Sequence, residues 1–151
     1  AMTAAETGHL VLGTLHTTGA VKTIDRIIDA LPIEEREQTK SFLSQSLIAV
    51  VTQVLCKTLD NQGRKAVCEV MLMTKAIAKL IQTDQTHQIP SQVQMGREFG
   101  MQLMDQALVA AVQAKEIDPD HAYSFAADKR ALQKFVTDTS VLPKLDLPAG
   151  G

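Results

Sequence analysis

The chain has 151 residues, 45% of them hydrophobic, which is enough for one globular domain with a sizeable core. A net charge of −2 gives no basic footprint and excludes the usual type of nucleic-acid-binding surface. The sequence predicts neither a membrane-spanning helix nor a signal peptide. Two cysteines, Cys56 and Cys68, lie outside any CxxC pattern, so we expect buried, reduced thiols in a cytoplasmic protein.

The segment 4–18, AAETGHLVLGTLHTT, predicts a helix end, a tight turn at Gly8 and one strand. Residues 10–15 are almost continuously apolar, which is typical of a strand buried on both faces of a parallel sheet. Polar residues follow this run, at the strand end where α/β sheets bind ligands. The chain contains no second strand of this kind, which indicates that it is a piece of something larger.

The chain contains four histidines as candidate ligands. His9 and His16 are seven residues apart, about 23 Å along a strand and on opposite faces, so they do not co-ligate one metal. No HExxH motif or Cys/His cluster is present, and we expect no metal site. His16 is either a solvent-facing or hydrogen-bonded side chain, or a contact to a ligand or phosphate. His87 and His121 are expected at the surface without a role.

Helical spacing predicts a helix over residues 21–31, ended by Pro32, and a long second helix over residues 33–55. The apolar middle of the second helix, SLIAVVTQVL, is expected to be buried between layers. A β-hairpin should follow, with strands at residues 55–59 and 65–73 around the turn at residues 60–63.

From Thr74 onward the chain is expected to be helical. Helices are predicted over residues 75–83, 90–98, 101–115 and 120–127, with Gly96 or Gly100 as a break. Asp118 and Asp128 are expected to cap the last helices, and the tail after residue 138 should be disordered or a linker.

No catalytic constellation is recognisable in the chain. The sequence contains no GxSxG, and no GxxxxGK[ST] that would build a glycine-rich cradle for nucleotide phosphates. The carboxylates of residues 25–37 indicate solvated helix faces rather than an acid/base pair. The residue pattern alone therefore predicts a domain without chemistry of its own.

Residues 4–17, AAETGHLVLGTLHT, together with KTIDRIIDALP at residues 22–32, resemble the PilT-like twitching-motility ATPases. This family comprises the retraction motors of type IV pili, within the secretion-ATPase superfamily. The resemblance extends to about residue 136 and includes SLIAVVTQVL and QIPSQVQMGREFGMQLMDQAL. In that family TGHLVxxTLHT is the His box, and its two histidines correspond to His9 and His16.

The resemblance implies a RecA-like ATPase domain preceded by a PAS-like domain, with six copies forming a ring. This chain would be its C-terminal part, with Walker A, the Walker B glutamate, the Asp box and the N-terminal arginines all upstream. The expected fold is mainly α with a few short β-strands. Residues 2–73 would be the C-terminal part of the RecA-like core, residues 74–137 a helical bundle and residues 138–151 a disordered tail.

The resemblance also implies roles and partners. Nucleotide sensing, rather than hydrolysis, would fall to His9, Thr14, His16 and Thr17. ATP with Mg²⁺ is implied for the full-length parent, whereas this chain alone should neither bind it tightly nor hydrolyse it. The implied partners are other copies of the chain and inner-membrane platform proteins of the pilus, with no nucleic acid and no membrane insertion. The implied location is cytoplasmic, peripheral to the inner membrane.

Residues 76–83, AIAKLIQT, correspond to the family's AIRNLIRE helix. The resemblance assigns an interaction role to five residues of this helix: Ala76, Ile77, Lys79, Leu80 and Ile81. Four polar positions differ, because Ala78 and Gln82 replace arginines, Lys79 an asparagine and Thr83 a glutamate. Two alternatives to pilus retraction therefore stay open: a motor of a related pilus or secretion system, or a free-standing helical interaction module derived from such an ATPase.

Overall fold

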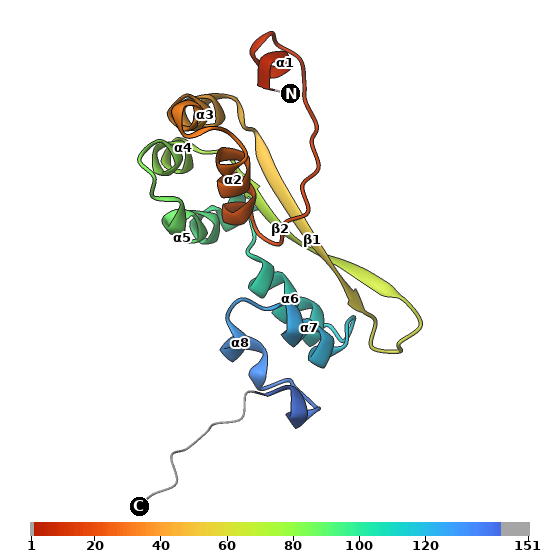
Figure 1. The fold of residues 1–151 in the computed structure, drawn as a ribbon. Coiled ribbons are helices and arrows are strands. Elements are labelled where there is room, and N and C mark those ends of the chain that lie inside the picture. Colours follow the sequence, from red (N-terminus) through yellow and green to blue (C-terminus); the bar gives the residue numbers. More distant parts are fainter. Residues whose placement is uncertain (1, 143–151) are drawn as a thin grey trace, which may run out of the picture.

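The computed structural model describes residues 2–142 of the chain (Figure 1). The N-terminal half contains α1 (Met2–Glu6), α2 (Ala20–Asp29), α3 (Ile33–Ser46), β1 (Ala49–Lys57) and β2 (Arg64–Leu72). The C-terminal half contains α4 (Lys75–Gln82), α5 (Ile89–Met95), α6 (Met104–Gln113), α7 (Pro119–Phe125) and α8 (Lys129–Gln133). Within residues 2–142, 3₁₀ helices also lie at Thr86–Gln88, Gly96–Phe99 and Thr139–Val141. The expectation of a mainly helical chain with a few strands is confirmed.

One antiparallel hairpin runs through the molecule. Its nine pairs extend from Ala49 opposite Leu72 to Lys57 opposite Arg64. The hairpin was predicted, but the helix predicted over residues 33–55 is wrong beyond Ser46, where α3 ends. Beyond that point buried and exposed residues alternate along β1, and β-branched residues favour an extended chain that is buried on one face only. SLIAVVTQVL therefore fits a strand better than a helix.

The inner face of the hairpin contributes to two hydrophobic clusters. At the end farther from the turn, Val50 and Met71 pack with the helices α2, α4 and α5 and the second half of α3. Towards the turn, Val54, Cys56 and Val67 pack with α6, α7 and α8. Figure 1 shows these two groups of helices at different levels of the same hairpin. The two strands are thus shared by both clusters.

Helix boundaries follow local signals. The predicted caps are confirmed: Thr74, Asp118 and Asp128 accept hydrogen bonds from backbone N–H groups at the start of α4, α7 and α8. The predicted break after α5 is also found, where Gly100 adopts a φ of +88° that side-chain-bearing residues rarely reach. Past the last helix, the 3₁₀ turn Thr139–Val141 occupies the start of the predicted tail, and residues 143–151 lie outside the described residues.

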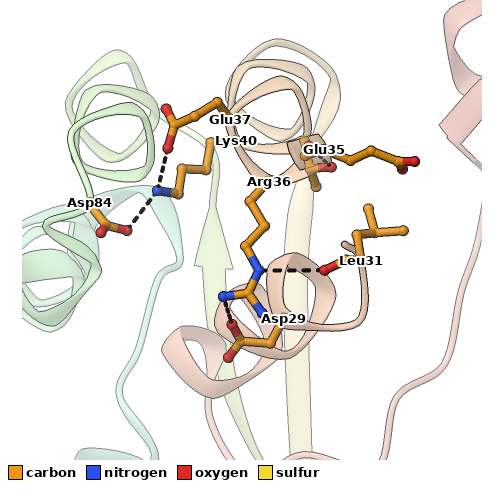
Figure 2. Close-up of polar contacts among 8 residues, drawn as sticks. Asp29, Leu31, Glu35, Arg36, Glu37, Lys40 and Asp84 are labelled. Carbon is orange, nitrogen blue, oxygen red and sulfur yellow. Dashed lines mark hydrogen bonds and ion pairs between the residues drawn. The ribbon is translucent and has the colours of Figure 1, made fainter. Parts of the chain in front are cut away.

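Two basic side chains of α3 connect it to its neighbours (Figure 2). Lys40 Nζ lies 2.9 Å from a carboxylate oxygen of Glu37 and 3.1 Å from one of Asp84, just after α4. These hydrogen bonds raise the pKa of Lys40. Arg36 contacts Asp29 at 3.1 Å and donates to the carbonyl oxygen of Leu31, which fixes α3 against the end of α2.

The strand predicted over residues 10–15 is not formed. These residues have no regular secondary structure, and Leu10 and Leu12 are 76% and 90% exposed. The physical reason is pairing: neither β1 nor β2 bonds to the segment, and a lone strand leaves its backbone groups without partners. The helix end at α1 and the turn at Gly8, with φ +88°, are found as predicted.

Candidate functional site

The segment of residues 9–18 runs as an extended connection between α1 and α2 (Figure 1, red). His9 Nδ1 lies 3.0 Å from Thr7 Oγ1, whose hydroxyl donates to the carbonyl oxygen of Ala4. Because the Thr7 proton is used in that bond and the Nδ1 of His9 also lies 3.3 Å from the carbonyl oxygen of Ala4, Nδ1 acts as a donor in this turn. The exposed imidazole of His9 is thus oriented by the turn after α1.

His16 and Thr14 are exposed on the same segment. The backbone of His16 is held near α2, because Arg26 donates a hydrogen bond of 3.4 Å to its carbonyl oxygen. His9 and His16 share no hydrogen bond or other polar contact in the described chain. The structure therefore does not assemble the sequence-predicted residues into one pocket, but presents them in a row.

The C-terminal end of the segment is firmly anchored. Thr17 Oγ1 lies 2.6 Å from Thr23 Oγ1, and the buried Thr23 hydroxyl donates at 2.9 Å to the carbonyl oxygen of Gly19. Since Thr23 has one hydroxyl proton, Thr17 is the donor between the two hydroxyls. Gly19, with φ +151°, gives the sharp entry into α2. Thr17 thereby links the segment to the first turn of α2.

Glu69, near the middle of β2, bonds to the same end of α2 as Thr17. Glu69 is only 9% exposed, and its Oε1 accepts a 2.6 Å hydrogen bond from the backbone N–H of Ala20, the first residue of α2. Oε2 accepts a 3.1 Å bond from the N–H of Met104, the first residue of α6. One buried carboxylate therefore joins the start of two helices that are 84 residues apart in sequence.

Neither Glu69 nor its neighbour Thr52 was singled out from the sequence. Thr52 pairs with Glu69 across the hairpin and is 5% exposed, and its hydroxyl has no hydrogen-bond partner among the described residues. A signal was present, because Glu69 occupies the same alternation phase as the apolar Val67 and Met71. A carboxylate on a buried strand face requires partners, and here backbone N–H groups supply them.

The helix α4, predicted as an interaction surface, divides its candidate residues between core and surface. Ile77 and Ile81 are fully buried and Leu80 is half-buried, whereas Ala76 and Lys79 are exposed. The isoleucines therefore hold the helix in place, and Ala76 and Lys79 lie on its exposed face.

His121, expected at the surface, is instead half-buried and part of the fold. Its Nδ1 accepts a 3.0 Å hydrogen bond from the backbone N–H of Lys57, so the ring is neutral with its proton on Nε2. Burial, and next the positive charges of Lys57 and Arg64, lower the pKa of His121. This histidine closes the edge of β1 against α7 and has no free nitrogen lone pair for a ligand.

Two features are absent from residues 2–142. No helix within this range is both long and apolar enough to cross a membrane. In the same residues, no three His, Cys, Asp or Glu side chains are grouped so that they could hold a metal ion.

The sequence was compared with protein families and with known proteins. Residues 1–119 match the family described as "Type II/IV secretion system protein". The chain belongs to this family. It is 48% identical over 132 residues to the "Twitching motility protein" of Neisseria gonorrhoeae, a match that covers 87% of the chain and 35% of that relative. It is also 48% identical over 122 residues to the "Type IV pilus retractation ATPase PilT" of Pseudomonas aeruginosa, with 81% and 35% covered.

The chain thus spans about a third of the length of these secretion-family relatives. A solved structure of the pilus retraction motor PilT with bound ADP superposes on 88% of the chain and 37% of that motor, with a TM-score of 0.77 and 34% identity. The ATPase DotB of Legionella pneumophila superposes with a TM-score of 0.66 at 23% identity, which supports the fold alone. The resemblance to PilT-like proteins and the expected fragment of an α/β ATPase fold are confirmed.

Proposed function

We propose that this chain is the C-terminal part of a PilT-like ATPase motor that powers type IV pilus retraction, with residues 9–17 as its nucleotide-sensing His box. The observation that carries the proposal is the row of exposed polar groups on His9, Thr14 and His16, anchored at both ends by Thr7 and Thr17. A segment that is fixed at its ends and open between them suits a contact with something bound outside the chain. The match to an ADP-bound PilT supports a nucleotide as that ligand.

The described residues fit one side of a nucleotide site only. Imidazole and hydroxyl groups can donate to phosphate oxygens, but the sequence contains no GxxxxGK[ST] motif whose backbone N–H groups would cradle them. In the proposed motor, residues upstream of the His box would hold ATP with Mg²⁺, which would supply the phosphoanhydride bond to be cleaved by water. His16 and Thr17 report its presence to α2. The chain alone is expected to bind nucleotide weakly and to hydrolyse none.

A chimeric motor tests the His-box role. The matched 132 residues of the N. gonorrhoeae relative are replaced by those of this chain, and Mg-ATP turnover is measured. His16→Ala should lower turnover at least about tenfold while nucleotide still binds, because a sensing contact is lost rather than the cradle. His87→Ala, an exposed histidine outside the segment, is the matched control and should change nothing. Equal turnover in His16→Ala and the unaltered chimera would contradict the proposal.

Assembly and location follow from the same proposal. The motor is a ring of copies of the full-length protein, attached to the pilus platform proteins on the cytoplasmic side of the inner membrane. The exposed residues Ala76 and Lys79 of α4 are the proposed contact to these partners. Light scattering of the chimera, with and without nucleotide, should detect a ring of six copies, and a strict monomer would refute this part.

A motor of a related pilus or secretion system is the second candidate. It is favoured by α4, where the departures from the family motif, at residues 78, 79, 82 and 83, fall on exposed or half-buried positions rather than in the core. Expressing the chimera in a retraction-deficient strain separates the two candidates. Restored twitching supports retraction, whereas restoration only after the family residues are placed at these four positions supports the related system.

A further inference from the structure

Glu69 occupies a position that ordinary helix capping does not explain. Neither α2 nor α6 has a side-chain cap of its own, because their N-cap residues are Gly19 and Leu103. Glu69, on β2, caps both helices instead: one oxygen of its carboxylate accepts a hydrogen bond from α2 and the other from α6. A negative charge is also favourable at both helix N-termini, where backbone N–H groups carry partial positive charge.

We propose that Glu69 is a positioning residue that couples the anchor of the His-box segment to α6. The inference rests on the proposed function, in that the segment is the part that responds to nucleotide. The two oxygens belong to one rigid, planar carboxylate, so a shift of Ala20 that pulls on Oε1 also turns Oε2 away from Met104. Thr17 is connected to Ala20 by Thr23 and the Gly19 carbonyl, which completes a continuous chain of hydrogen bonds.

The α6 end of this chain is held in place independently. Gln102 forms an antiparallel bridge with Val70, with N···O distances of 2.9 and 3.0 Å, and its side chain donates to the carbonyl oxygen of Cys68 at 2.7 Å. The residues just before α6 are therefore fixed to β2 beside Glu69. Loss of the bond between Glu69 and Met104 would free the first turn of α6 without detaching the helix.

Thr52 gives the carboxylate a second arrangement. Its buried hydroxyl lies across the hairpin from Glu69 and is without a partner in the described chain. When Ala20 moves away, this hydroxyl can donate to the freed Oε1, so that this oxygen keeps a partner while the bond between Oε2 and Met104 is lost. Coupling between distant sites requires an element with two discrete arrangements, and in our proposal Glu69 with Thr52 is that element.

Amide hydrogen exchange of the 151-residue chain, followed by NMR, tests the coupling without nucleotide. Thr17→Ala removes the bond from Thr17 to Thr23, and exchange at the Met104 amide should accelerate about threefold to tenfold relative to Val54, a core amide of β1. Thr18→Ala, an exposed neighbour whose side chain bonds to no other described residue, is the matched control and should not change the Met104 rate.

The decisive comparison uses Glu69→Gln. Glutamine keeps the shape but has one acceptor oxygen, so it bonds either Ala20 or Met104 and cannot transmit a shift between them. We expect Thr17→Ala to leave Met104 exchange unchanged in this background. An equal acceleration in the wild-type and Glu69→Gln backgrounds, or none in the wild-type background, overturns the proposal.

If Glu69→Gln does not fold, Thr52→Val replaces it as the test background. Without the reserve donor the second arrangement is lost, so the Met104 response to Thr17→Ala should shrink, and an undiminished response overturns the proposal. Because no nucleotide is used, failure here leaves the His-box function standing. Conversely, a chimera insensitive to His16→Ala would discard the nucleotide role and leave the coupling.

Discussion

Two buried threonines, when replaced by valine, should change the free energy of unfolding in opposite directions. Thr52 and Thr23 are 5% and 6% exposed, but only Thr23 has hydrogen-bond partners for its hydroxyl among the described residues. Replacement by valine removes the hydroxyl and keeps the branched shape at both positions. Burial is thus matched, and hydrogen bonding is the variable.

The structure sets the magnitudes. A buried hydroxyl without a partner costs about 1–3 kcal/mol, so Thr52→Val should raise the free energy of unfolding by roughly 1 kcal/mol. Thr23 makes bonds of 2.9 Å to the Gly19 carbonyl oxygen and 2.6 Å to Thr17, each contributing about 0.5–1.5 kcal/mol. Thr23→Val should therefore lower the free energy of unfolding by about 1–3 kcal/mol.

Urea denaturation at about 25 °C, followed by far-ultraviolet circular dichroism, measures both changes. The midpoint should move up for Thr52→Val and down for Thr23→Val with unchanged slope, since neither variant alters the surface exposed on unfolding. A loss of stability in Thr52→Val as large as that in Thr23→Val would refute the reasoning. It would mean that the Thr52 hydroxyl already stabilises the resting structure.

Three further predictions concern single sites. Gly96→Ala should lower the free energy of unfolding by about 1–3 kcal/mol, because a Cβ there would lie 2.5 Å from Met101 Cε and 3.1 Å from Met101 Cγ. The cost should vanish in a Met101→Ala background, which urea titrations of the two single variants and the double variant check. The pKa of His121 is lowered mainly by burial, so this side chain binds a proton more readily in the unfolded chain than in the folded one. Its contribution to the free energy of unfolding is therefore complete above about pH 7.5 and falls as the pH drops through about 6.5. Thermal unfolding scans at several pH values should show this dependence in the wild type and not in His121→Gln. Asp84→Asn removes the 3.1 Å ion pair between this exposed carboxylate and Lys40, while asparagine tolerates the positive φ of 60° at this position. The urea midpoint should therefore fall by the equivalent of at most about 1 kcal/mol. A larger fall would show that the ion pair contributes more to the contact between α3 and α4 than an exposed pair should.

Local signals in the sequence predicted local structure well. Thr74, Asp118 and Asp128 cap helices as expected, because an N-cap depends only on the next few residues. Residues 47–55 were misread as helix, since a short apolar run is compatible with a buried helix or a strand, and the pairing of residues 49–55 with residues 66–72 decides between them.

Long-range contacts could not be predicted. The apolar pattern of residues 10–15 is that of a strand, yet strand formation requires a neighbour that the described chain does not provide. Glu69 was recognisable as a carboxylate among apolar residues, but its bonds to Ala20 and Met104 join positions 49 and 35 residues away. Of the candidate site, the row of polar residues His9, Thr14 and His16 was evident from the sequence, and the anchor formed by Thr23 and Glu69 was not.

The hairpin that serves both hydrophobic clusters also determines where the chain can change its length. Deleting Gln53 would reverse the facing of every later residue of β1, turning Val54 and Cys56 outward while Val50 kept its place. The cluster around α6–α8 would lose both of its β1 residues and keep only Val67 of β2, and the other cluster would keep its strand residues. Residues added at the turn between β1 and β2, by contrast, shift no side chain from one face to the other. Evolution of this chain can therefore lengthen the tip of the hairpin freely, but can alter its stem only in steps of two.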